Sequence, residues 1–135
     1  MRLFLVLIIA AACSACSSFD TTYFLNNFET LAETPNDTPT LSVRVFKIQE
    51  EGECDNGECP QAQLYIAVSE FGEYPDKNVF ITEKADAWHF SDWISIPKLG
   101  DEPLQSTFRV KKTIGNNQHS LIVTVDTKTV SFMRE

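Results

Sequence analysis

The chain has 135 residues, of which 19 are acidic and 11 are basic, and its net charge is −8. This length allows one ordinary domain with a single core, and a hydrophobic content of 43% excludes wholesale disorder. The negative charge argues against a nucleic-acid partner, because the phosphate groups would be repelled. Two histidines and four cysteines leave little material for a metal centre or a catalytic triad, and we expect no cofactor.

The first residues have the order of a bacterial export signal. Met1-Arg2 is a short positive segment, and Leu3 to Ala12 is an unbroken apolar run. A membrane-spanning helix needs about 20 apolar residues, so this run is too short for one and is typical of the core of a signal peptide. The alternative is a buried apolar helix that happens to contain cysteines, and the signal-like order of the segment argues against it.

The sequence that follows, Ala12-Cys13-Ser14-Ala15-Cys16-Ser17-Ser18, places small residues around two cysteines. It resembles the lipobox of bacterial lipoproteins, and the resemblance covers only this N-terminal segment. It implies that one cysteine thiol receives a diacylglycerol, that signal peptidase II cleaves before that cysteine, and that the new amine is acylated, for example with palmitate. Serine rather than aspartate after the anchor implies sorting to the outer membrane, with the mature chain facing the periplasm.

Either cysteine suits the lipobox pattern. Cys13 follows three alanines but leaves a short signal, whereas Cys16 follows Ser14-Ala15 but puts Cys13 where the pattern prefers leucine. We favour Cys16, with Cys13 as the alternative, because an anchor at Cys13 would leave Cys16 as an odd thiol in an oxidising compartment. The predicted organisation is a signal peptide at 1–15, a lipidated tether at 16–40 and a β-domain at 41–135.

The predicted tether contains one candidate helix. Between Phe19 and Glu33, apolar residues recur at helical spacing at Phe24, Phe28 and Leu31. A strand through residues 23–25 is the competing interpretation. Residues 34–40 contain two prolines in a polar stretch, which predicts an extended connector.

After Thr40 the pattern is that of β-strands. Candidate strands are residues 41–48, 63–71, 79–82 and 93–96. In the first of them the apolar residues change phase between Val45 and Phe46. This change predicts either a bulge or a strand that is covered on both faces.

The C-terminal third predicts a three-stranded meander. A two-residue turn at Asn116-Asn117 and a second turn around Thr127-Lys128 would set apolar residues opposite one another on a single face. The expected pairs are Phe108 with Val125, Val110 with Val123, Val125 with Val130, and Val123 with Phe132. The fold class is therefore all-β: a small antiparallel β-sandwich or barrel of about seven strands that ends in this meander.

Cys54 and Cys59 flank the turn-forming sequence Asp55-Asn56-Gly57-Glu58. Half of a zinc site is one reading of this spacing, but the chain has no second Cys/His pair to complete four ligands. A disulfide across a hairpin tip is the preferred interpretation. Five acidic residues surround the tip without a base: Glu50, Glu51, Glu53, Asp55 and Glu58. They lack the ligand spacing of an EF-hand, and a solvated acidic loop is the simplest interpretation.

Trp88, Phe90 and Trp93 bring both tryptophans of the chain together within a short segment. On a regular strand Trp88 and Phe90 share one face and Trp93 takes the other, so one large aromatic would stay exposed as a candidate partner face. The alternative is a bulge that lets all three pack inward. His89, Ser91 and Asp92 are interleaved with them, but on a regular strand Asp92 faces away from His89 and Ser91, which disfavours a triad.

These features predict a membrane-anchored binding protein rather than an enzyme. We expect a lipid-anchored accessory protein for binding or assembly in the bacterial envelope, with another envelope protein as its partner. The alternative is a periplasmic inhibitor of a lytic enzyme such as lysozyme. No nucleophile elbow, zinc-protease motif or phosphate-binding loop occurs in the sequence, so we do not expect catalysis.

Overall fold

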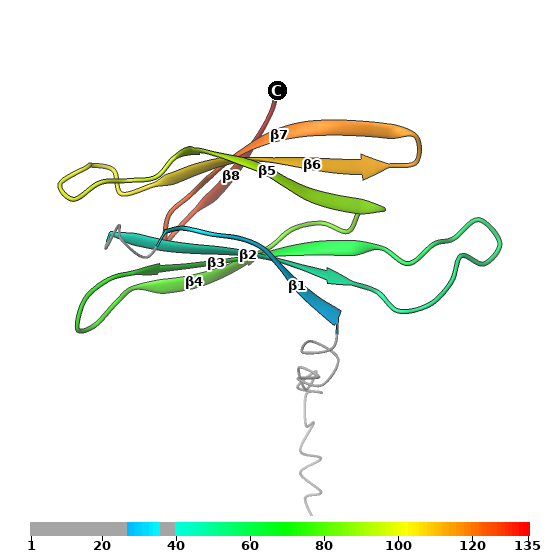
Figure 1. Ribbon diagram of the computed structural model, residues 1–135, viewed down its shortest axis with the longest axis horizontal. Coiled ribbons are helices and arrows are strands. Elements are labelled where there is room, and N and C mark those ends of the chain that lie inside the picture. The colour runs from blue at the N-terminus through cyan, green and yellow to red at the C-terminus, as the bar shows by residue number, and fades with distance from the viewer. Residues whose placement is uncertain (1–26, 36–39) are drawn as a thin grey trace, which may run out of the picture.

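The computed structural model describes residues 27–35 and 40–135, and it confirms the predicted all-β class as a sandwich of two antiparallel sheets (Figure 1). Each sheet has four strands. The first contains β1 (Phe28–Glu33), β2 (Leu41–Gln49), β3 (Ala62–Glu70) and β4 (Lys77–Ile81), and the second contains β5 (Ala87–Ser95), β6 (Ser106–Ile114), β7 (Asn117–Val125) and β8 (Val130–Arg134).

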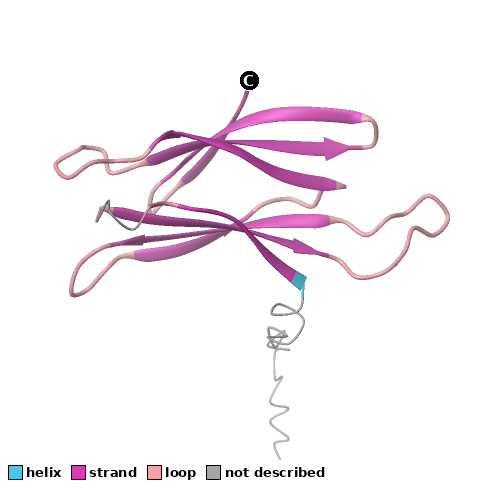
Figure 2. Cartoon of the chain, viewed as in Figure 1, coloured by secondary structure: helices cyan, strands magenta, loops and turns pink. Residues whose placement is uncertain are grey.

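The chain completes one sheet before it begins the other. Both sheets are simple meanders, in the orders β1-β2-β3-β4 and β5-β6-β7-β8. Figure 2 shows them as two layers of strands connected by loops at both ends. In the connection between the layers, the backbone groups of Ala85 and Ala62 exchange hydrogen bonds of 3.0 and 2.8 Å. The crossover is thereby fixed to the start of β3.

Strict alternation of apolar residues builds the core between the layers. On β2 and β3 the inward residues Val43, Val45, Leu64 and Ile66 are fully buried. The second sheet contributes the buried residues that pack against them: Trp88, Phe108, Val110, Val123 and Val125. Because side chains alternate across a strand, the intervening residues face outward on both sheets.

The expected helix is wrong in the described part of its segment, because Phe28–Glu33 forms the edge strand β1. It pairs with β2, with Phe28 opposite Ile48 and Glu33 opposite Arg44. The β-domain therefore begins before the predicted boundary at residue 41. Helical spacing in so short a segment is weak, and pairing with the free edge of β2 satisfies the backbone groups of β1. The competing strand at residues 23–25 lies outside the described residues.

The change of apolar phase in β2 reflects coverage of both faces. The pairing of β2 with β3 continues from Leu41 to Gln49 without a shift, so β2 has no bulge on that side. Phe46 and Ile48 face outward, and the ring of Phe28 lies 5.7 Å from that of Phe46. Of the two predicted explanations, the strand covered on both faces is correct.

The predicted meander is present, with one register confirmed and one corrected. Val125 pairs with Val130 and Val123 with Phe132, as predicted. Between β6 and β7, however, Phe108 pairs with Val123, two residues from the predicted partner. The turn is formed by Gly115-Asn116 rather than Asn116-Asn117. Gly115 has φ +57°, a conformation that glycine adopts at little cost and that hairpin turns require.

Candidate functional site

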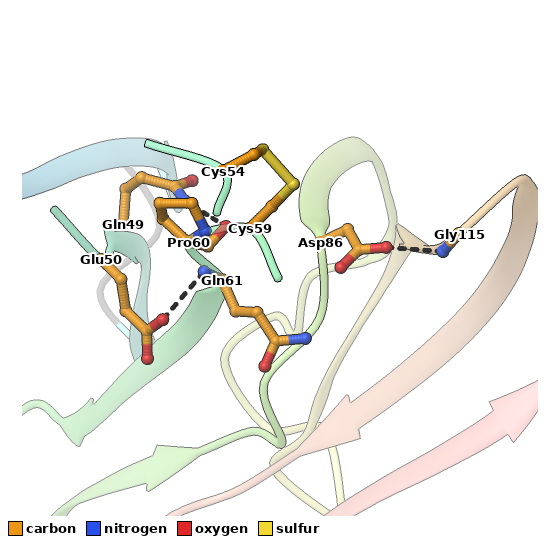
Figure 3. Close-up of a disulfide and its surroundings, with 8 residues drawn as sticks. All are labelled: Gln49, Glu50, Cys54, Cys59, Pro60, Gln61, Asp86 and Gly115. Carbon is orange, nitrogen blue, oxygen red and sulfur yellow. Dashed lines mark hydrogen bonds between the residues drawn. A yellow bond between two sulfur atoms is a disulfide. The ribbon is translucent and has the colours of Figure 1, made fainter. Parts of the chain in front are cut away.

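The predicted disulfide joins Cys54 and Cys59 at the tip of the β2–β3 hairpin, where their Cα atoms are 4.0 Å apart (Figure 3). Inside the bridge, the backbone groups of Asp55 and Glu58 exchange two hydrogen bonds of 2.8 Å. The two residues at the turn, Asn56 and Gly57, have φ values of 50° and 83°. Positive φ at both central positions is the signature of a type I′ hairpin turn, which explains why Asn-Gly occupies them.

Side chains at the base of this loop hold its two arms together. Glu50 Oε2 accepts a hydrogen bond of 2.9 Å from the backbone N–H of Gln61, and Gln49 Nε2 donates one of 3.2 Å to the carbonyl of Pro60 (Figure 3). The other carboxylate oxygen of Glu50 is ion-paired with Lys84, in the crossover between the sheets. The hairpin is therefore fastened both across its arms and to the body of the sandwich.

The five predicted acidic residues all lie on this fastened loop, which projects from one end of the sandwich (Figure 1). All five line an open hollow, together with Asn56, Cys59 and Pro60. Within residues 27–35 and 40–135, no group of three or more His, Cys, Asp or Glu side chains is placed to hold a metal ion. The loop thus presents a negatively charged surface that would attract cationic groups on a protein.

The pKa of Glu50 lies below its ordinary value, because the carboxylate accepts hydrogen bonds from Lys84 and from the Gln61 amide. The ionised form is therefore favoured in the folded protein. The ionised Glu50 carboxylate stabilises the folded protein at pH values above the ordinary pKa of a glutamate, about 4. This stabilisation is lost as the pH falls through the lower pKa that Glu50 has in the folded protein. We expect Glu50→Gln to lower the Tm at pH 7 but to leave it close to that of the parent at pH 3, in thermal unfolding followed by circular dichroism.

Glu73→Gln is the matched control, because Glu73 is an exposed glutamate of the β3–β4 loop. It removes the same charge without removing these hydrogen bonds. An equal loss of Tm in both variants at pH 7 would contradict the assignment and point to net charge instead.

The aromatic segment packs inward, so the expected division over two faces is wrong. Trp88 is 1% exposed, and Phe90 and Trp93 are half-buried against the core. The ring of Phe108 lies 5.8 Å from Phe90 and 5.3 Å from Trp93. The pairing of β5 with β6 shifts between Phe90 and Asp92, and this bulge returns Trp93 to the inner face. These residues consequently offer little surface to a partner.

The same bulge turns Asp92 outward, where it faces Arg109 rather than a catalytic histidine. Arg109 NH1 lies 2.7 Å from Asp92 Oδ1, and NH2 lies 2.9 Å from Glu135 Oε1. These hydrogen bonds raise the pKa of Arg109 and lower that of Glu135. His119 Nδ1, near the β6–β7 turn, lies 2.9 Å from Arg134 NH2. The contacts of Arg109 with Asp92 and Glu135 form a tie across the outer face of the second sheet, whereas His119 and Arg134 are in register with the inward-facing residues of β7 and β8.

Two features of the surface were not anticipated from the sequence. An open hollow of about 770 Å³ lies on the outer face of β2–β4, where the small residues Ser42, Ala67 and Ser69 meet Arg44 and Phe71. The ion pair of Glu50 with Lys84 spans 34 residues. Small outward residues on adjacent strands are a signal that could have indicated the hollow, whereas nothing in the sequence joins Glu50 to Lys84.

Cys13 and Cys16, the predicted lipidation sites, lie outside the described residues. In the part of the chain that the structure describes, there is no helix of the length and apolarity needed to cross a membrane. No protein-family profile matches the chain, and no curated protein and no solved structure is significantly similar to it.

Proposed function

We propose that the protein is a lipid-anchored binding or assembly accessory protein of the bacterial envelope, held at the outer membrane with its β-sandwich facing the periplasm. The observation that carries this proposal is the order of the first residues: arginine, an unbroken apolar run, and small residues around Cys13 and Cys16. A pair or trio of acyl chains on one cysteine gives a stable anchor, because each buried methylene contributes about 0.8 kcal/mol. The disulfide-closed hairpin suits an oxidising compartment.

The anchor is tested by replacing each candidate cysteine. Cys16→Ser is expected to abolish incorporation of an alkynyl palmitate probe and to release the protein from the membrane fraction, whereas Cys13→Ser retains both. The double variant Cys54→Ser/Cys59→Ser is a control for loss of cysteines outside the lipobox. If probe labelling persists in Cys16→Ser and is lost in Cys13→Ser, the lipidated residue is Cys13 rather than Cys16. Labelling in neither parent nor variants would refute the lipoprotein assignment.

The binding role is supported by the acidic β2–β3 loop. Partners are steered by complementary charge, and a loop that is already ordered loses little conformational entropy on binding. The expected partner is another envelope protein with a basic surface. Cross-linking in intact cells followed by purification should yield one stable envelope complex. Reversing charge in Glu53→Lys/Glu58→Lys should weaken it, while the matched variant Glu73→Lys/Asp76→Lys, at the opposite end of the sandwich, should not.

The second candidate is inhibition of a lytic enzyme such as lysozyme, and the same loop favours it. A narrow hairpin closed by a disulfide and carrying five carboxylates has the form of a plug for a cleft with a basic rim. In a cell-wall lysis assay with purified lysozyme, this function predicts saturable inhibition that Glu53→Lys/Glu58→Lys relieves. Unchanged lysis at excess protein would reject the inhibitor function. A stable envelope complex found in the same study would then support the accessory role.

A further inference from the structure

A cavity lies between the end of β4 and the inner face of the second sheet, and its volume is about 320 Å³. Apolar side chains form most of its lining, which comes from both layers: Ile81, Thr82, Glu83, Trp88, Lys112, Leu121 and Phe132. Phe132 is 43% exposed, so the cavity is open to solvent beside it. Ligand sites are mostly apolar and have volumes of about 300–1,000 Å³, and this cavity therefore has room for a small molecule.

Lys112 brings a positive charge into this apolar lining. Phe108 and Val110 of the same strand are buried in the core, and alternation along β6 therefore directs Lys112 inward as well. Its side chain is only 13% exposed, and Nζ lies 5.8 Å from the centre of the Trp88 ring. The carboxylate that pairs with it belongs to Glu83, whose side chain is 67% exposed. A largely buried cation is thus balanced by an anion at the solvent boundary, where another anion can replace it.

Arg134 adds a second cation at the same end of the inner face. It pairs across the strands with Leu121, which lines the cavity, while His119 pairs with Lys112. The Arg134 NH2 group lies 2.9 Å from His119 Nδ1, and Nδ1 is the acceptor because an arginine can only donate. Among the residues that the structure describes, no carboxylate forms an ion pair with Arg134. One end of the apolar cavity therefore carries two cations and one ion-paired acid, Glu83.

We propose that this cavity binds a small amphiphile with an apolar tail and an anionic head, either a carboxylate or a phosphate. The tail lies against the apolar lining, and the head accepts hydrogen bonds from Lys112 Nζ and the Arg134 guanidinium. Charge complementarity selects the anion, because the chain as a whole has a net charge of −8 and yet places two cations beside this cavity. Glu83 competes with the head for Lys112. The proposal depends on neither the lipid anchor nor the acidic loop.

Contact quenching of Trp88 fluorescence tests the site directly. The full chain carrying Trp93→Phe, in lipid nanodiscs, has Trp88 as its only tryptophan. Titration with 10-bromodecanoate should quench this fluorescence saturably, after subtraction of ligand that partitions into empty nanodiscs. The alcohol 10-bromodecanol has the same tail without the charge, and it should bind at least about tenfold more weakly. Absence of saturable quenching, or equal affinity for the acid and the alcohol, would refute the proposal.

Competition identifies the source of the anionic head. Decanoate and decyl phosphate should both displace 10-bromodecanoate, whereas decyltrimethylammonium, which has a cationic head, should not. Tighter binding of decanoate supports the proposal with a free fatty acid as the ligand class, and tighter binding of decyl phosphate supports it with a lysophospholipid. Displacement by the cationic amphiphile as effective as that by decanoate would contradict the proposal.

Charge variants test the assignment of the head to its two partners. Lys112→Met and Arg134→Met should each raise the Kd of 10-bromodecanoate at least about tenfold and leave that of 10-bromodecanol unchanged. Lys111→Met is the matched control, because Lys111 is the preceding residue of β6 and is exposed on the opposite face. It should bind like the parent. Equal weakening by Lys111→Met and Lys112→Met would overturn the assignment. Lys112→Arg, which keeps the charge, should retain binding if Lys112→Met does not fold.

Glu83→Gln should have the opposite effect. Releasing Lys112 from its ion pair should tighten binding of 10-bromodecanoate about two- to fivefold, the range expected from the strength of an exposed ion pair. Glu73→Gln makes the same change in the exposed β3–β4 loop and should leave the Kd unchanged. Parent-like thermal unfolding verifies that each variant is folded. A folded Glu83→Gln protein that binds no more tightly than Glu73→Gln would contradict the proposed competition and the site with it.

Discussion

Replacing Trp88 with alanine should destabilise the protein by about 3–5 kcal/mol, the range measured when a buried tryptophan or phenylalanine is truncated. Trp88 is the largest of the fully buried side chains and lies between the two sheets. Its loss leaves a cavity that strands held in two ladders cannot collapse to fill. Urea unfolding followed by circular dichroism should show a lower midpoint with an unchanged slope.

Trp88→Phe is the informative control. The indole Nε1 of Trp88 is buried and has no hydrogen-bond partner in the described part of the chain. Leaving a buried donor unsatisfied costs about 1–3 kcal/mol, so phenylalanine removes that cost as well as part of the ring. We expect Trp88→Phe to lose much less stability than Trp88→Ala. Trp93→Ala should fall between them, because Trp93 is half-buried. A midpoint for Trp88→Ala equal to that of the parent would contradict the core assignment.

Loss of the Cys54–Cys59 disulfide should have the second-largest effect on stability. In the chain-entropy account, closing so short a loop stabilises the fold by about 2 kcal/mol. The double variant Cys54→Ser/Cys59→Ser is preferable to either single one, because it leaves no odd thiol. We expect its urea midpoint to fall and to match that of the parent protein in reductant.

The matched control uses the same double variant. Reductant should lower the midpoint of the parent and leave that of Cys54→Ser/Cys59→Ser unchanged. Alkylation under denaturing conditions checks the bond itself: without reductant, Cys54 and Cys59 of the parent should remain unmodified. Modification of both thiols would show that the pair is reduced in the mature protein.

Features that depend on neighbouring residues were predictable from the sequence. The alternation in β2 and β3 and in the C-terminal meander places the correct residues in the core, because side chains of a strand point to opposite faces in turn. Cys54 and Cys59 flank Asn56-Gly57, whose backbone preference forms the hairpin turn. The register of β7 with β8 follows from the turn around Thr127-Lys128.

Other features depend on contacts between distant segments. Phe28–Glu33 becomes a strand because β2 offers it an edge, and Trp93 faces inward because β5 bulges against β6. The ion pairs of Glu50 with Lys84 and of Arg109 with Glu135 join residues that are far apart in the sequence.

Residues within a short span specify the strand periodicity, the hairpin with its disulfide and the lipobox-like N-terminus, so these features could be predicted from the order of the amino acids. The β1 edge strand and the inward position of Trp93 depend instead on the packing of segments that are distant in the sequence. Hydrogen-bond pairing and packing between sheets choose among conformations that the local sequence leaves nearly equal in energy.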